Sequence, residues 1–125
     1  MIAYGIGVLP LIRELRGAHP QVTQPWYADD AGAGGKFQQI LEHFRYLQAR
    51  GPAQGYYPET TNNILVVHPG IISRAEEHLR GMGIRVVTGH CNLGGSIGDR
   101  EAEGSWLVTK IKRWTESVAI LAGVA

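Results

Sequence analysis

Cysteine is almost absent from this sequence, because Cys91 is the single example among 125 residues. One thiol cannot form a disulfide within the chain, which excludes the small disulfide-stabilised secreted domains and is typical of a reducing compartment. Long apolar runs are absent too, and none approaches the roughly 20 residues of a membrane-spanning helix. The first residues also lack the basic region of a secretory signal. We therefore expect an intracellular protein, nuclear or cytoplasmic, with no signal peptide and no transmembrane segment.

A large excess of one charge is also lacking, since 12 lysines and arginines face 11 aspartates and glutamates. A formal net charge of +1 gives no strong overall field, so any nucleic-acid binding must come from local basic patches. With 44% hydrophobic residues, a chain of this length fits one globular domain with a modest core.

Hydrophobic spacing predicts helices over residues 3–16, 36–50 and 99–122, the last capped by Asp99, and a shorter helix that Gly81 ends. β-branched and aromatic residues predict strands over residues 22–28, 64–67 and 84–87. This alternation is typical of a sheet covered by helices, so we expect a mixed α/β (α+β) fold. The apolar stripe of the first helix is Ile2, Ile6, Leu9, Ile12 and Leu15, and that of the last is Leu107, Ile111, Trp114, Val118 and Leu121.

Two adjacent carboxylates, Asp29 and Asp30, follow the strand-like run that ends in Trp26 and Tyr27, and glycines come next. Neighbouring carboxylates repel each other, and a divalent cation would remove the conflict. Successive side chains of a strand point to opposite faces, so both aspartates reach one metal only at a turn. We expect a hairpin turn with a metal site here, and the alternative is an ordinary solvated Asp-Asp-Ala-Gly turn.

Other motifs are weaker. The glycine-rich run after the aspartates is not a Walker loop, because Asp30 and Phe37 stand where that loop needs glycine and serine or threonine. His90 and Cys91 lack a second pair of ligands at zinc spacing. A hydrolase that uses Cys91 with a distant histidine stays open, although nothing in the local sequence supports an activated thiolate.

The run Tyr27-Ala28-Asp29-Asp30 resembles the aromatic-x-Asp-Asp box of reverse transcriptases. Residues 1–11 are similar to the helix that follows the Gln-Gly-x-Pro motif of that family, and residues 55–67 are similar to its next palm block. Leu93-Gly94-Gly95 looks like the Tyr-Leu-Gly turn of the primer grip. In this order the segments resemble the palm of enzymes of the non-LTR retroelement type, over nearly the whole chain.

The resemblance implies a single partial palm domain over residues 1–125, an antiparallel sheet with helices packed on it, with 99–122 as a thumb-side helix. It implies DNA synthesis by two-metal nucleotidyl transfer, with an RNA or DNA template-primer and a deoxynucleotide as partners. Asp29 and Asp30 would be the catalytic ligands of Mg²⁺, or of Mn²⁺. The residues near the primer or nucleotide would be Tyr27, Ala28, Leu93, Gly94 and Gly95.

The sequence also departs from the family pattern. The family's first catalytic aspartate precedes the Gln-Gly-x-Pro motif, whereas the only other aspartate here is Asp99. Asn62 and Asn63 stand near a position where the family usually has a lysine, and Cys91-Asn92 replaces a usual aromatic residue. We expect the fingers and the amino-terminal part of the palm to be missing, metal binding to be weak, and the isolated chain not to polymerise.

Two further readings of the sequence are non-catalytic. One is a nucleic-acid-binding remnant that contacts phosphates through Lys110, Lys112 and Arg113, with Arg80 and Arg85 as further candidates, although charges on helix faces are often simply solvated. The other is an acidic-loop metal binder unrelated to polymerases.

Overall fold

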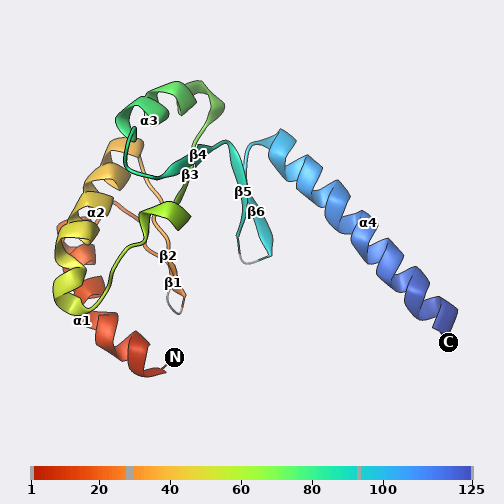
Figure 1. Cartoon of the computed structure of the whole chain (residues 1–125), viewed down its shortest axis with the longest axis horizontal. Helices are drawn as coiled ribbons and strands as arrows, with labels where there is room; N and C mark the ends of the chain where they lie inside the picture. Colours follow the sequence, from red (N-terminus) through yellow and green to blue (C-terminus); the bar gives the residue numbers. More distant parts are fainter. Residues whose placement is uncertain (1, 28–29, 93, 125) are drawn as a thin grey trace. The chain divides into compact units, whose positions relative to one another are not determined.

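Four α-helices and six short strands make up the computed structural model, which describes residues 2–27, 30–92 and 94–124 (Figure 1). The predicted mixed α+β class is confirmed. The chain divides into two compact units, Met1–Glu59 and Thr60–Ala125. The first contains α1 (Ile2–Ala18), β1 (Trp26–Tyr27), β2 (Asp30–Ala31), α2 (Phe37–Arg50) and a 3-10 turn at Pro52–Gln54. The second contains β3 (Ile64–Val66), α3 (Ile72–His78), β4 (Arg85–Val87), β5 (Gly89–Asn92), β6 (Gly95–Gly98) and α4 (Arg100–Val124), with 3-10 turns at Thr60–Asn62 and Pro69–Ile71.

The helix predicted near the amino terminus is present as α1, but its buried face differs from the predicted stripe. Ile6 and Leu9 are exposed, whereas the buried residues are Val8, Leu11, Ile12 and Leu15. At 3.6 residues per turn those four positions fall within about 100° of arc, so they form a tighter stripe than the predicted one, which drifts around the helix. Pro10 lies inside α1 and is exposed.

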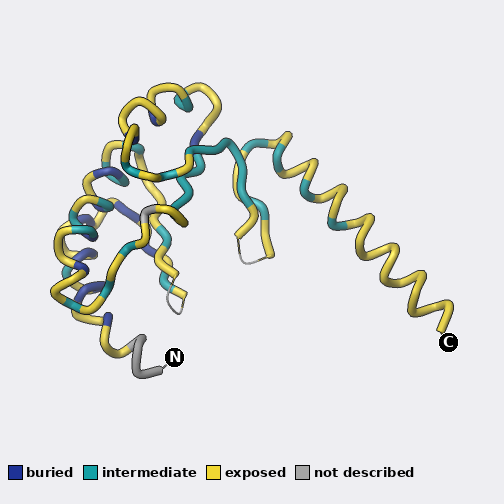
Figure 2. The backbone as a smooth tube through the Cα atoms, viewed as in Figure 1, coloured by how far each residue is buried: buried dark blue, intermediate teal, exposed yellow. Residues whose placement is uncertain are grey.

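The core of the first unit lies between α1 and α2, where Leu11, Leu15 and Leu47 form one buried cluster. Figure 2 shows buried stretches along both helices. Both helices also meet at a polar contact, because the Glu14 carboxylate accepts hydrogen bonds from Tyr46 Oη at 2.9 Å and from Arg50 Nε at 2.5 Å. The hydrogen bond from Arg50, and then that from Tyr46, lowers the pKa of Glu14 below its ordinary value.

The second unit begins with a β3–α3–β4 crossover, and Leu65 lies opposite Val86 in a parallel pair. A helical connection between neighbouring strands favours parallel pairing, which explains why this pair is not antiparallel. Ala75 and Leu79 of the α3 region are buried. Within the described residues the strands thus form three two-stranded sheets, one of them parallel, instead of the single antiparallel sheet that we expected.

The remaining strands, β5 and β6, form an antiparallel hairpin that contacts the first turns of α4. Asp99 caps this helix as predicted, because its Oδ1 accepts a hydrogen bond from the Ala102 amide at 2.8 Å. Along the part of the chain that the structure describes, no helix combines the length and the apolarity needed to cross a membrane.

Candidate functional site

The strands β1 and β2 form a tight antiparallel hairpin around the Tyr27-Ala28-Asp29-Asp30 box. Trp26 lies opposite Ala31, and Tyr27 lies opposite Asp30. The same register continues beyond the two strands, because Thr23, before β1, and Gly34, after β2, exchange two backbone hydrogen bonds of 2.8 Å. Tyr27 and Asp30, the two ends of the box, thus face each other across the hairpin, and Gly34 already lies on its returning side.

The two faces of this hairpin have opposite character. Trp26 is half-buried, packs against the core cluster of the first unit and meets the Tyr56 ring edge-on at 5.6 Å between ring centroids. Tyr27 and Asp30 are cross-strand partners, so their side chains share the other face, and both are exposed. Because Trp26 is held in the core, the next cross-strand pair, which includes Asp30, points to the opposite face.

The glycines after Asp30 have a packing role that the sequence did not reveal. Gly32 donates a backbone hydrogen bond to the Pro25 carbonyl at 2.8 Å, and a Cβ atom on Gly32 would stand 2.9 Å from Cγ of Pro25. Only glycine fits at this close approach without a shift of the Pro25 ring. The run therefore belongs to the returning side of the hairpin, and the exclusion of a Walker loop is consistent with this position.

One of the two predicted catalytic residues belongs to the described part of the chain. Asp29, like Ala28, lies outside the described residues. Asp30 is on β2 and exposed. Among residues 2–27, 30–92 and 94–124, no three His, Cys, Asp or Glu side chains gather where they could hold a metal ion. The described part of the hairpin thus offers one carboxylate, that of Asp30, toward a cation.

The predicted primer-grip turn lies at the tip of the β5–β6 hairpin in the second unit. Asn92 pairs with Gly95, and Gly94 has a left-handed φ of 79°, as the reversal requires. Leu93 lies outside the described residues. A glycine-rich tight turn was predicted over residues 93–98, whereas the structure places Gly95–Gly98 of this run in strand β6.

The predicted basic residues lie on α4. Lys112 and Arg113 are exposed and Lys110 is half-buried. The Lys110 ammonium lies 5.7 Å from the ring centroid of Trp106 and 5.8 Å from that of Trp114, one helical turn away on either side. Two cation–π contacts hold this ammonium between two indoles. These three residues follow one another at intervals of four, so the sequence spacing could have revealed that they stack along one side of the helix.

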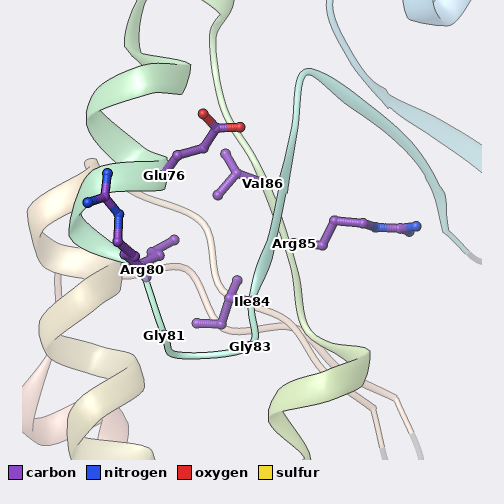
Figure 3. A pocket seen from close by; sticks show the side chains of 8 residues that line it. Glu76, Arg80, Gly81, Gly83, Ile84, Arg85 and Val86 are labelled. Atoms are coloured by element: carbon purple, nitrogen blue, oxygen red, sulfur yellow. The ribbon is translucent and has the colours of Figure 1, made fainter.

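The other proposed cations, Arg80 and Arg85, line a shallow depression of about 640 Å³ beside α3 and β4 (Figure 3). Its apolar lining comes from Leu79, Ile84 and Val86. Figure 3 shows the two guanidinium groups pointing away from each other, with Arg85 on the far side of β4. The depression therefore does not bring them together on one phosphate.

A buried polar cluster in the first unit was not predicted from the sequence. His19, Gln24 and His43 are all at least nine-tenths buried, and each carries a side-chain nitrogen without a hydrogen-bond partner. The imidazoles of His19 and His43 meet edge-on with 5.5 Å between centroids, and the Tyr46 ring lies edge-on at 5.3 Å from that of His19. Burial, and then the neighbouring His19, lowers the pKa of His43 below 6.5.

Comparison with family models, with curated proteins and with solved structures found no match to this chain.

Proposed function

We propose that this chain is part of the palm of an RNA-directed DNA polymerase, of the reverse transcriptase type found in non-LTR retroelements, and that it does not polymerise alone. The register of the β1–β2 hairpin supports the proposal most directly. It pairs Tyr27 with Asp30, the first and last residues of the Tyr27-Ala28-Asp29-Asp30 box, and adjacent carboxylates can approach one site only where a chain turns. Helix α1 precedes this hairpin in the order that the resemblance implies.

In the parent reaction a primer 3′-hydroxyl attacks the α-phosphate of the incoming deoxynucleotide, and Mg²⁺ ions supply charge stabilisation of the attacking and leaving oxygens. Asp29 would be the principal ligand and Asp30 a second ligand or an electrostatic support. Tyr27 shares the exposed face with Asp30, which is the face open to a primer end. The turn at Gly94 and Gly95 would serve as the primer grip.

We expect the aspartates of this sequence not to complete a two-metal centre. Asp99, the third aspartate of the sequence, uses its side chain to cap α4 in the second unit. Among the described residues, Asp30 does not belong to any group of three or more His, Cys, Asp or Glu side chains that could hold a metal ion. Mg²⁺ is held by few carboxylates together with substrate phosphates, and two adjacent aspartates alone should bind it weakly. Asn62 and Asn63 also provide no ammonium for the departing pyrophosphate.

A primer-extension assay with a metal-binding control tests both parts of the proposal. We expect no template-dependent incorporation with Mg²⁺ or Mn²⁺, and Mn²⁺ binding with a dissociation constant of roughly 1 mM or weaker. In NMR spectra, Mn²⁺ should broaden the amide signals of Tyr27 and Asp30. Asp29→Asn should abolish this broadening, whereas Asp99→Asn, which keeps a side chain able to cap α4, should not.

Template-dependent incorporation by the wild-type chain would show that the fragment is active and refute its inactivity. If Mn²⁺ broadened the amide signals equally in both variants, the hairpin would not be the metal site. This result would contradict the polymerase assignment.

Nucleic-acid binding without catalysis is a second candidate function, favoured by α4. Lys110, Lys112 and Arg113 follow one another within four residues, and two indoles flank Lys110. Phosphate contacts combined with aromatic surfaces are the usual means of binding single strands without sequence preference.

A gel shift with single-stranded RNA tests this function. Three phosphate contacts predict weak binding whose affinity falls with salt, with a logarithmic slope near −2. Lys112→Gln with Arg113→Gln should reduce that slope, whereas Arg45→Gln, on an exposed site of α2, should leave it unchanged. Binding that does not respond to salt would rule out this role for α4.

A further inference from the structure

The apolar stripe predicted on the last helix is present but is not covered. Leu107, Ile111, Trp114, Val118 and Leu121 are 48% to 69% exposed along α4. Figure 2 shows this helix exposed over almost its whole length. The β5–β6 hairpin contacts α4 only near its start, around Ala102. A stripe of this size needs a partner, and its residue types indicate which one.

These five residues follow one another at intervals of four, three, four and three residues, which is the seam of a coiled coil. In heptad notation Ile111 and Val118 occupy a positions, and Leu107, Trp114 and Leu121 occupy d positions. β-branched residues at a with leucine at d favour a parallel pair of two helices over larger bundles. We call these five residues the α4 seam.

The charges of α4 fit the same register. Lys112, Arg113 and Glu116 fall at b, c and f, on the side of the helix away from the seam. Beside the seam stand Lys110 and Thr115, at g and e, which would face each other across a parallel pair. The positions that would approach a second copy therefore hold no facing pair of like charges, so a copy of the same helix can dock without repulsion.

We propose that two copies of this chain associate in parallel through the α4 seam. With half to two-thirds of each side chain free, the seam and its apolar flanks offer about 400 to 600 Å² per copy. The pair would bury about 800 to 1,200 Å², at the low end of the range for specific interfaces. The dimer is therefore weak, with a dissociation constant of roughly 10 to 100 μM. This association does not depend on the polymerase assignment.

Sedimentation equilibrium of the full chain tests the proposal between about 1 μM and about 1 mM. The average mass should rise from 13.6 kDa toward twice that value and stop there. Val118→Glu should raise the dissociation constant by roughly 100-fold or more, because it puts a charge into the desolvated seam. Ile120→Glu is the matched control, since Ile120 is 68% exposed and Val118 64%, but Ile120 falls at c.

The control should dimerise like the wild-type chain. A wild-type mass of 13.6 kDa at every concentration would overturn the proposal, since the seam would then be covered by another part of the chain or belong to a different partner. Growth beyond the dimer, or equal weakening by both substitutions, would also overturn it, because either result indicates unspecific apolar association.

Discussion

His43 lies buried against His19 inside the first unit, and this has a consequence for stability in acid. Each ring has a buried nitrogen without a partner, and each faces the other imidazole instead of a carboxylate. Tyr46, whose ring meets that of His19, donates a hydrogen bond to Glu14, and this carboxylate also accepts one from Arg50. A proton added to His43 would therefore place an uncompensated charge in the core.

We expect the first unit to lose stability as the pH falls below about 6.5. The pKa of His43 is lower in the folded than in the unfolded chain, so the unfolded chain takes up the proton first as acid is added. The stabilisation that neutral His43 provides is complete above the pKa that this residue has in the unfolded chain. It is lost as the pH falls through the lower pKa that His43 has in the folded chain. Urea midpoints between about pH 7.5 and about pH 5.5 measure this loss.

His43→Phe, which keeps an aromatic ring but cannot titrate, should flatten the dependence of the urea midpoint on pH. His68→Asn is the control, because His68 is exposed and its ring only accepts a hydrogen bond from the Gly70 amide. The control should keep the slope of the wild-type chain. An unchanged slope in His43→Phe would show that other groups cause the acid sensitivity.

Which single residues matter could be predicted only where the chemistry is local. The box and the cap at Asp99 depend on neighbours in the sequence, and the capping prediction is confirmed. The buried pair His19 and His43 joins residues 24 positions apart, and an isolated histidine carries no signal of what it will face. The contact of Gly32 with Pro25 was also missed, because it depends on the register of the hairpin.

At the scale of elements, the docking of the β5–β6 hairpin on α4 depends on a glycine. A Cβ atom on Gly89 would stand 2.2 Å from Cβ of Ala102, so the strand and the helix touch there without space for a methyl group. Gly104, two residues further along α4, has no heavy atom within 4 Å of the place of its Cβ. The two glycines thus form a matched pair.

Gly89→Ala should destabilise the chain by about 1 to 3 kcal/mol, because it overpacks the contact between β5 and α4. Gly104→Ala should instead stabilise it by up to about 1 kcal/mol, since alanine favours the helix. Urea unfolding followed by circular dichroism distinguishes the two signs. A neutral Gly89→Ala would mean that the hairpin can move away from α4 at no cost.

Helices were predicted better than their buried faces. The period of 3.6 residues appears in the sequence whether or not a partner is present, so α1, α2 and α4 could all be found. The buried face of α1 depends on where α2 lies, and the wide apolar arc of α1 allows more than one choice. The strand predicted over residues 22–28 is a short β1 at Trp26–Tyr27, with an isolated bridge at Thr23 and a backbone hydrogen bond from Gly32 to Pro25.

At the scale of the whole molecule, the chain divides into two compact units, Met1–Glu59 and Thr60–Ala125, and the single domain suggested by length and composition stays a prediction. Each unit buries a few large side chains, such as Leu11 and Leu47 in the first and Leu79 in the second. The composition fixes the amount of apolar surface but not how it is divided, because the division depends on contacts between distant residues. The Tyr27-Ala28-Asp29-Asp30 box lies in the first unit, whereas the proposed primer-grip turn lies in the second.

The alternation of faces along β2 constrains how the sequence of this hairpin can change in length. Trp26 points to the core and Asp30 to the open face, and Gly32 is held in place beside Pro25. One residue inserted between Asp30 and Gly32 would turn the carboxylate toward the core, whereas two would restore its direction. We therefore expect related chains to accept single-residue insertions after Gly34, and to reject them within these three positions.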